Sequence, residues 1–587
     1  MREFLWNLCV MPESNLLAQT AREKKVLAEY HLGSASFQFL MAVSTPSSAS
    51  TAQIRTKCRQ DHGSRGGESH CKWLERTLRR SHLPNSFHQK DESDITPEVV
   101  DSRMRLRPER CTLSRRDLLR NLGGFVGGGG ALSLLPTSLF AQSSYTAESR
   151  RPQPQDRKFH SDAVESYIAS ICKSISDPML ANLFTDCFPN TLDTTVQPGT
   201  YEGKPDTAVL TGDIPAMWLR DSSAQVWPYL VLASKDARLR SLLEGVIRRQ
   251  VRCILIDPYA NCFMADLNAP PLEWSRNDQT EMKQGVGERK YELDSLCYPI
   301  RLAHGYWKNT GDTGPFDSQW KLAMQTVLRT MQVQQRKHDP GPYHFQRRAF
   351  NPTDTLVNGI GGPLKPNGLI ASAFRPSDDA CIFPFLVPAN LFAVTSLRQL
   401  STMANNVLHD SAMANEARAL ADEVSAAVCH HAIFPTSAGT IWAYEIDGYG
   451  SHICMDDANA PSLLSLPYLD CSPDAALYSR TRSFVWSQQN PWFFRGIAGE
   501  GIGSPHIGRD SIWPMSQIIY ALTSDSSTQI KRTIESLKES TAGTGFVHES
   551  YNRNDAASFT RAWFAWANTL FGELIGKTIE RYPHLLT

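Results

Sequence analysis

Two acidic segments that lie far apart in the chain could supply a pair of working carboxyl groups. Asp378 and Asp379 form a doublet, and Glu549 stands alone in a later segment. Cleavage of a glycosidic bond requires two such groups: one protonates the leaving oxygen, and the other activates water or attacks the sugar. Because the two groups flank the bond, they usually come from distant parts of a sequence. The sequence therefore predicts a sugar-cleaving enzyme.

The doublet is the first catalytic candidate. Mutual repulsion between neighbouring carboxylates raises the pKa of one of them, and a raised pKa is what a general acid requires at neutral pH. The alternative is helix capping, because Ser377, Asp378 and Asp379 are all favoured at a helix N-terminus. One aspartate could cap a helix while the other acts in catalysis.

Glu549 is the second catalytic candidate. It lies in the segment Thr544–Tyr551, between two helical patterns, with His548 before it and Tyr551 shortly after it. These neighbours could hold the glutamate by hydrogen bonds inside a pocket. The alternative is a solvated glutamate on the surface.

The segment Gly212–Ser222 predicts a binding loop for a polyhydroxyl ligand. Trp218 offers a flat face, and Arg220 and Asp221 offer fixed hydrogen-bond donors and acceptors. Asp221 could equally cap the helical pattern that follows.

Further ligand-binding candidates have the same types of side chain. Glu292 and Asp294 alternate, so in an extended segment they would share one face. For each candidate, a structural salt bridge is as good an explanation as ligand contact. The set comprises Glu292, Asp294, Arg375, Asp456, Asp457, His506, Arg509, Asp510 and His548.

The composition excludes several classes of partner and cofactor. Lys+Arg and Asp+Glu number 60 each, so the net charge is zero, and nothing favours a nucleic acid or an anionic membrane surface. The 13 cysteines include no CxxC pair and no Cys/His ligand spacing. We therefore expect no metal site and no cofactor, and buried free thiols at Cys253, Cys297 and Cys381.

Helical periodicity dominates the chain from residue 158 onward. No Gly/Ser linker divides 158–587, so we predict one domain. Long loops separate the helices at 187–215, 257–293 and 338–377, and a strand-like piece at 439–444 suggests a hairpin. The predicted helices are 160–176, 223–234, 238–256, 294–309, 317–336, 379–401, 409–432, 460–469, 474–487, 510–523, 527–540 and 557–581.

About twelve helices with functional loops between successive pairs favour an all-α fold, an (α/α)6 barrel with long pocket-forming loops and minor β-hairpins. Weak internal repeats agree. Arg220-Asp221-Ser222 recurs as Arg509-Asp510-Ser511, and Asp378-Asp379-Ala380 recurs as Asp456-Asp457-Ala458. Each copy is predicted at the start of a helical segment, which suggests equivalent positions in the barrel.

The N-terminal part contains a pattern typical of export. Arg115 and Arg116 precede a Gly/Leu-rich apolar stretch from Leu122 to Leu135, which is typical of a twin-arginine signal. The stretch is too short and too rich in glycine for a membrane span, so we expect no integral membrane domain. We expect 104–142 to be the signal peptide, with Met104 as initiator, and a periplasmic or secreted product. Residues 1–103 are then a disordered leader or an over-extended gene start. An ordinary loop with chance arginines is the alternative.

Five ordered blocks of the chain resemble glycoside hydrolase family 125, the exo-α-1,6-mannosidases. The blocks are Asp213–Ser222, Lys290–Pro299, Phe374–Ala380, Met455–Ser462 and His548–Ser550. The resemblance implies an (α/α)6 barrel and metal-independent, inverting removal of α-1,6-linked mannose from the non-reducing end. It implies a mannose-containing oligosaccharide or N-glycan fragment as substrate. It also implies a general acid from the Asp378–Asp379 pair, preferably Asp378, and Glu549 as general base.

Two other functions remain open at the level of sequence. A non-catalytic glycan-binding protein would need the aromatic residues but not the paired acids. A magnesium-dependent helical enzyme acting on diphosphates would use Asp378–Asp379 and Asp456–Asp457 as ligands. Neither pair has carboxylates spaced one helical turn apart, and basic residues are sparse nearby, which disfavours the second alternative.

Overall fold

The computed structural model describes residues 149–349, 351–437, 439–471 and 474–587. The predicted leader 1–103 and the predicted signal 104–142 lie outside the described residues.

Helices make up most of the regular structure. The α-helices are α7 (Asp162–Cys172), α8 (Pro178–Cys187), α9 (Asn190–Thr194), α10 (Leu219–Val226), α11 (Ala237–Ile256), α12 (Leu293–Thr310), α13 (Ser318–Gln334), α14 (Val387–Asn406), α15 (Ser411–His431), α16 (Ala475–Val485), α17 (Pro514–Leu522), α18 (Ser527–Glu539) and α19 (Ala565–Arg581). The 3-10 turn η2 (Trp227–Lys235) continues α10. The strongly periodic predictions, such as 238–256 and 527–540, are confirmed.

Several predicted boundaries are wrong. The segment predicted as helix 379–401 is irregular until α14 begins at Val387, with Pro388 in its first turn. Residues 460–469 form bends and consecutive turns rather than a helix. Helix α8 was not predicted. A proline fits the first turn of a helix because its missing N–H would be unpaired there anyway.

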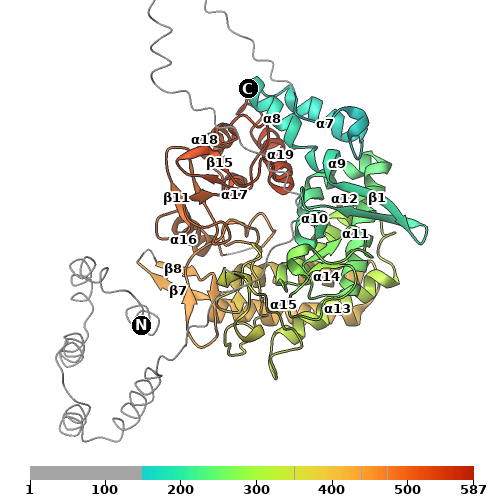
Figure 1. The fold of residues 1–587 in the computed structure, drawn as a ribbon, viewed down its shortest axis with the longest axis vertical. Coiled ribbons are helices and arrows are strands. Elements are labelled where there is room, and N and C mark those ends of the chain that lie inside the picture. Colours follow the sequence, from blue (N-terminus) through green and yellow to red (C-terminus); the bar gives the residue numbers. More distant parts are fainter. Residues whose placement is uncertain (1–148, 350, 438, 472–473) are drawn as a thin grey trace, which may run out of the picture. The chain divides into compact units, whose positions relative to one another are not determined.

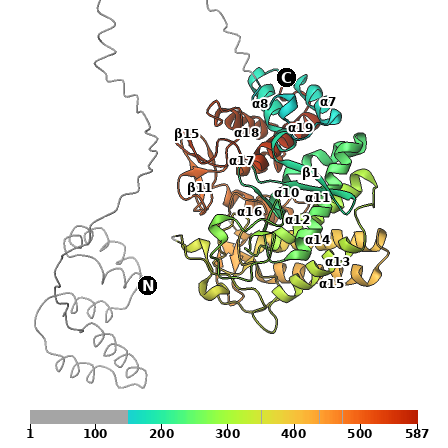
Figure 2. The ribbon, with the colours of Figure 1, turned by 45° about the vertical axis from the view of Figure 1, so that its right-hand side comes forward.

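The helices follow one another around a ring in chain order (Figure 1). Along the inside, α10 contacts α12, α12 contacts α14, and α17 contacts α19. The last helix, α19, also packs against α10 and α8, which closes the ring. On the outside, α11 contacts α13 and α13 contacts α15. Figures 1 and 2 both show α13 and α15 on the opposite side of the ring from β11 and β15.

Burial distinguishes the inner from the outer helices. Every residue of α10 is buried, whereas α18 buries only the stripe Ile530, Thr533, Ile534 and Leu537. The spacing of that stripe follows the helical period, so one face of α18 packs inward and the rest meets water. An inner helix such as α10 has no solvent face.

Short antiparallel strands lie at the ends of the helices. The three-stranded sheets are β3-β4-β5 (Ala216–Trp218, Cys262–Met264, Val286–Glu288), β6-β9-β10 (Phe385–Leu386, Glu445–Ile446, His452–Ile453) and β13-β14-β15 (Ser511–Ile512, Tyr551–Asn552, Asp555–Phe559). The hairpins are β1-β2 (Val196–Tyr201, Lys204–Val209), β7-β8 (Ile433–Thr436, Gly439–Trp442) and β11-β12 (Phe493–Arg495, Glu500–Ile502). The β7-β8 pair confirms the predicted hairpin at 439–444.

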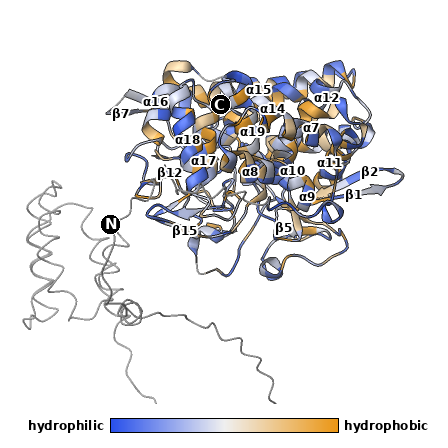
Figure 3. Cartoon of the chain, turned by 90° about the horizontal axis from the view of Figure 1, so that it is seen from above, coloured by the Kyte–Doolittle hydropathy of each residue, from blue (hydrophilic) through white to orange (hydrophobic). Residues whose placement is uncertain are grey.

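The sheets that carry the candidate site share one side of the helical layer. Figure 3 shows β5 and β15 along that side and β7 near α16 on the other. The cysteines of the described part are free thiols, and Cys253, Cys297 and Cys381 are buried as predicted. Among the described helices, none is both long enough and apolar enough to span a membrane.

Candidate active site

The aspartate doublet lies in a tight turn, not at a helix start. The Arg375 N–H donates to the Asp379 carbonyl (2.7 Å), and the Asp378 N–H donates to the Arg375 carbonyl (2.9 Å). Asp378 has φ of +66°, a left-handed conformation that aspartate tolerates better than most residues. The helix-capping interpretation of the doublet is therefore wrong, because α14 begins only at Val387.

The carboxyl group of Asp378 is the more accessible one of the doublet. Its side chain is 23% exposed, whereas that of Asp379 is 3% exposed. Arg220 Nη2 lies 3.6 Å from Asp378 Oδ1, and Asn261 Nδ2 donates to the same oxygen at 3.0 Å. Arg220 from the first turn of α10 and Asn261 from the residue before β4 thus orient a carboxyl group that still meets solvent.

Arg220 is the centre of a buried charge cluster. Beyond Asp378, its guanidinium donates to Glu292 in a short hydrogen bond and lies 3.6 Å from Asp294 and 3.4 Å from Asp221. Glu292 precedes α12 without a side-chain capping hydrogen bond and Asp294 lies in its first turn, so the segment is not extended, yet both carboxyl groups face Arg220. One cation therefore faces four carboxyl groups.

Burial and this crowding separate the pKa values in the cluster. Burial raises the pKa of Glu292 well above its usual range, and repulsion from Asp378 adds to the rise. Burial also opposes ionisation of Asp378, but the Arg220 charge and a hydrogen bond from Glu292 outweigh it and hold the pKa of Asp378 below its usual range. These two opposite shifts favour a proton on Glu292 over one on Asp378. Burial raises the pKa values of Asp221 and Asp294 to about 6.

Lys290 holds the turn that contains Asp378 and Asp379. Its ammonium group donates to the Asp378 carbonyl at 2.8 Å and to Asp354 at 2.6 Å. Thr353 then holds Asp379: its hydroxyl donates to Asp379 Oδ1 (3.0 Å), and its carbonyl accepts the Ala380 N–H (2.6 Å). The doublet is thereby fixed to two neighbouring loops.

His506 lies against the buried member of the doublet. Its Nδ1 is 3.4 Å from Asp379 Oδ1. Burial lowers the pKa of His506, but the hydrogen bond and charge of Asp379 outweigh it, so the pKa is raised. His506 is 38% exposed, which leaves an edge of the imidazole free for a ligand.

Glu549 is held at both oxygens. The Thr560 hydroxyl donates to Oε2 at 2.8 Å, and Arg561 Nε lies 3.3 Å from Oε1. Arg561 also pairs with Asp213 at 2.9 Å, which joins the Glu549 segment to the loop before β3. The side chain of Glu549 is only 10% exposed, so the interpretation as a solvated surface glutamate is wrong.

Asp221 connects the two acidic segments. The Arg220 and Arg561 charges favour its ionisation and the charge of Asp378 opposes it, and Arg561 is the partner of Glu549. A line of rings makes a second connection: His506 and Phe564 each lie 6.4 Å from Trp513. The segments of Asp378 and Glu549 therefore converge on one region of the molecule.

Several predicted ligand-binding residues have structural partners. Trp218 is the last residue of β3, is 4% exposed and packs with Leu272 in a small core, so little of its indole faces solvent. Arg375 is buried and pairs with Glu445 at 2.6 Å. Both ring nitrogens of His548 face backbone carbonyls, at 3.0 to 3.1 Å, and the ring stacks on Phe559.

The second acidic doublet also supports the fold. Asp456 accepts the N–H groups of Leu463 and Leu464 at 2.8 and 2.9 Å. Asp457 accepts from the Ser377 and Ser504 hydroxyls at 3.0 and 2.9 Å, which ties down the turn of the first doublet.

Arg509 and Asp510, the predicted repeat of Arg220 and Asp221, do not lie in similar surroundings. Arg509 is exposed, and Asp510 forms an ion pair with Arg553 at 2.9 Å. Among the described residues, no group of His, Cys, Asp or Glu is arranged to hold a metal ion.

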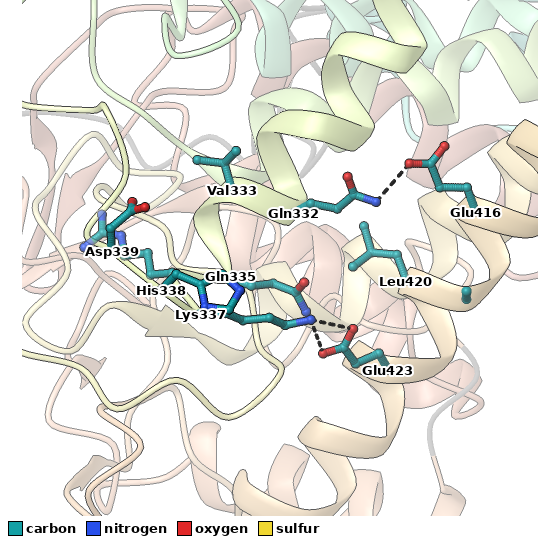
Figure 4. Close-up of a pocket in the computed structure, with 11 residues that line it drawn as sticks. Gln332, Val333, Gln335, Lys337, His338, Asp339, Glu416, Leu420 and Glu423 are labelled. Carbon is teal, nitrogen blue, oxygen red and sulfur yellow. Dashed lines mark hydrogen bonds and ion pairs between the residues drawn. The ribbon is translucent and has the colours of Figure 1, made fainter.

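A groove of about 510 Å³ lies elsewhere, between α13 and α15 (Figure 4). Leu420 lies at its floor, and Lys337 pairs with Glu423 across it. No candidate site residue lines this groove, so it is separate from the carboxyl groups.

Comparison with known proteins identifies the family. Residues 177–576 match the model of glycoside hydrolase family 125, described as metal-independent α-mannosidase. The chain belongs to this family. It is 41% identical over 462 residues to the "Meiotically up-regulated gene 157 protein" of Schizosaccharomyces pombe, covering 74% of this chain and 89% of that protein.

A solved structure of a family member agrees. It is a Streptococcus pneumoniae metal-independent α-mannosidase in a non-productive complex with α-1,6-mannobiose, and it shares 38% identity with this chain. The TM-score is 0.69, and the match covers 72% of this chain and 99% of that one. Family and structure together support α-mannosidase activity for this chain.

Proposed function

We propose that this α-mannosidase is an exo-acting, inverting enzyme that removes α-1,6-linked mannose from the non-reducing end of glycans. The observation that carries the proposal is that Asp378 lies against Arg220, while Glu549 lies against Arg561, whose charge acts on Asp221 beside Arg220. The S. pneumoniae relative binds α-1,6-mannobiose, which supports the linkage. The closed ring of inner and outer helices supports an (α/α)6 barrel as the scaffold.

Asp378 is the general acid in this mechanism. It protonates the bridging oxygen, while Glu549 removes a proton from a water on the opposite face of the sugar ring, and the anomeric centre inverts. Thr560 and Arg561 fix both oxygens of the base, so it is oriented before substrate arrives. Inverting carboxyl pairs lie roughly 6.5–9.5 Å apart to leave room for the water.

The acid needs a proton, which free Asp378 lacks because its pKa is lowered. Glu292 holds one next to it, because its own pKa is raised by burial. A sugar that displaces water over Asp378 disfavours the aspartate charge, which moves the shared proton from Glu292 to Asp378. Glu292 thus acts as a proton store for the acid.

Substitution of the acids tests these roles. We expect Glu549→Gln to lose several orders of magnitude in kcat on every mannoside with little change in sugar binding. Asp378→Asn should abolish hydrolysis of α-1,6-mannobiose but spare α-mannosyl fluoride, whose leaving group needs no proton. If Asp379→Asn shows that selective pattern instead, Asp379 is the acid.

The stereochemistry is read directly by proton NMR of the first product. An inverting enzyme releases β-mannose from an α-mannoside. Release of α-mannose would contradict the mechanism, and cleavage within a longer chain would contradict exo action.

We also propose export by the twin-arginine route, supported by Arg115 and Arg116 before the apolar stretch 122–135. The test is to fuse residues 104–142 to a fluorescent protein in bacteria with and without the twin-arginine translocase. Export should require the translocase, and Arg115→Lys with Arg116→Lys should abolish it.

A further inference from the structure

Trp274 is an exposed aromatic side chain on a loop that is firmly held. It is 49% exposed and lies in the 3-10 turn η3 (Glu273–Ser275), between β4 and β5 in the chain. Figure 3 shows β5 on the side of the helical layer that carries the candidate site. Its neighbours are fixed: Leu272 packs in the small core with Trp218, and buried Ser275 accepts a hydrogen bond from Arg347 at 3.2 Å. The indole is therefore presented to solvent on a rigid base.

The indole is oriented by a buried carboxylate that also reaches the proposed acid. Trp274 Nε1 donates to Glu288 Oε1 at 3.2 Å, and Asn261 Nδ2 lies 3.5 Å from Glu288 Oε2. The same Asn261 amide donates to Asp378 at 3.0 Å. Glu288 is buried, at 3% exposure. Glu288 and Asn261 together therefore connect the exposed indole of Trp274 to Asp378.

The identity of the acid decides which part of a substrate lies near Trp274. A general acid protonates the bridging oxygen, so the leaving sugar departs from its side of the bond and the attacked sugar lies between acid and base. The leaving sugar consequently passes over residues next to Asp378 on the solvent side. A flat, half-exposed indole suits the apolar face of a pyranose ring.

We propose that Trp274 is the stacking platform for the leaving sugar, the residue that binds the glycan remaining after the terminal mannose is removed. The inference rests on the proposed function. It assigns to Trp274 the role that the sequence suggested for Trp218, whose burial excludes it. The ligand is a hexopyranose ring in the leaving position, within a glycan of at least two sugars.

Kinetics on two substrates test the proposal. Trp274→Ala should lower kcat/KM for α-1,6-mannobiose about tenfold, largely through KM. It should leave kcat/KM for α-mannosyl fluoride within about twofold, because that substrate has no leaving sugar. Trp274→Phe keeps a flat ring and should recover most of the loss. Tyr449→Ala, at an aromatic residue that is 65% exposed on another turn, is the matched control and should change neither substrate.

Each outcome has a defined meaning. An unchanged kcat/KM for mannobiose overturns the proposal, and so does an equal loss on both substrates, which indicates a structural role. Failure of the unmodified enzyme to hydrolyse α-mannosyl fluoride would refute the proposed function instead.

A chemical probe checks contact directly in the Asp378→Asn variant, which binds without turnover. α-1,6-Mannobiose should protect Trp274 from oxidation by N-bromosuccinimide, measured by peptide mass spectrometry, whereas mannose should not. Equal protection by mannose would place Trp274 beside the attacked sugar and overturn the assignment.

Discussion

The buried ion pair between Arg375 and Glu445 secures the turn that carries Asp378. The two side chains are 2% and 0% exposed and lie 2.6 Å apart. The other oxygen of Glu445 accepts the N–H groups of Ile382 and Phe383 at 3.0 and 3.1 Å. Glu445 therefore holds both the start and the end of the segment around the doublet, and we expect Arg375→Met to destabilise the protein and displace the acid.

The expected loss is about 3 kcal/mol. Removal of one partner of a buried ion pair typically costs about 3–5 kcal/mol, because the remaining charge has no counterion. Glu445 keeps its two backbone donors in the variant, which places the loss at the lower end of that range. The double variant Arg375→Met with Glu445→Gln carries no buried charge at this place, so it should regain part of the stability.

Urea unfolding followed by tryptophan fluorescence measures the loss, and kcat on an aryl α-mannoside below the unfolding midpoint measures displacement of the acid. Arg398→Met, at an exposed arginine on α14, is the control and should leave both unchanged. A loss below about 1 kcal/mol for Arg375→Met, or a double variant less stable than the single one, would refute the reasoning about buried charge.

Three further predictions concern the base, pH and metals. Arg561→Gln should lower kcat about tenfold with unchanged unfolding, because Glu549 loses one of its two fixed contacts; an unaltered kcat would remove Arg561 from this role. Burial raises the pKa of Asp456 to about 8, so its contribution to stability is complete below about pH 4 and is lost as pH rises toward 8. Asp456→Asn should flatten this fall in unfolding midpoints measured between pH 4 and 8, and an identical slope would contradict it. Dialysis against EDTA should leave mannosidase activity unchanged, and restoration of a lost activity by added metal would count against the metal-independent class.

The helical pattern predicted the outer helices well because each has an apolar face toward the core and a polar face toward solvent. It misplaced the start of α14, since the apolar residues Ile382, Phe385 and Leu386 continue the three- and four-residue spacing through a segment that is not helical. Pro388 was the available signal for the true start. The turns at 460–469 are as buried as an inner helix, so composition could not separate the two.

The candidate site was predictable in its residue types and less so in their roles. Arg220 and Glu292 were recognised, but only the fold shows that they form one charge cluster. Asn261, Lys290 and Arg561 were not assigned roles, because each acts through a contact with a segment remote in sequence. Lys290 begins one of the blocks that carry the family resemblance, which was the one local hint.

The closure of the ring by α19 has a consequence for synthesis. The helix that meets α10 and α8 spans 565–581, more than 330 residues after α10, and the Ser176 N–H donates to the Leu586 carbonyl at 2.9 Å. Glu549 also emerges late from the ribosome. A nascent polypeptide therefore has neither a sealed scaffold nor its base until residues 549–581 have been made, and a stop codon upstream of α19 should leave the enzyme without a working centre.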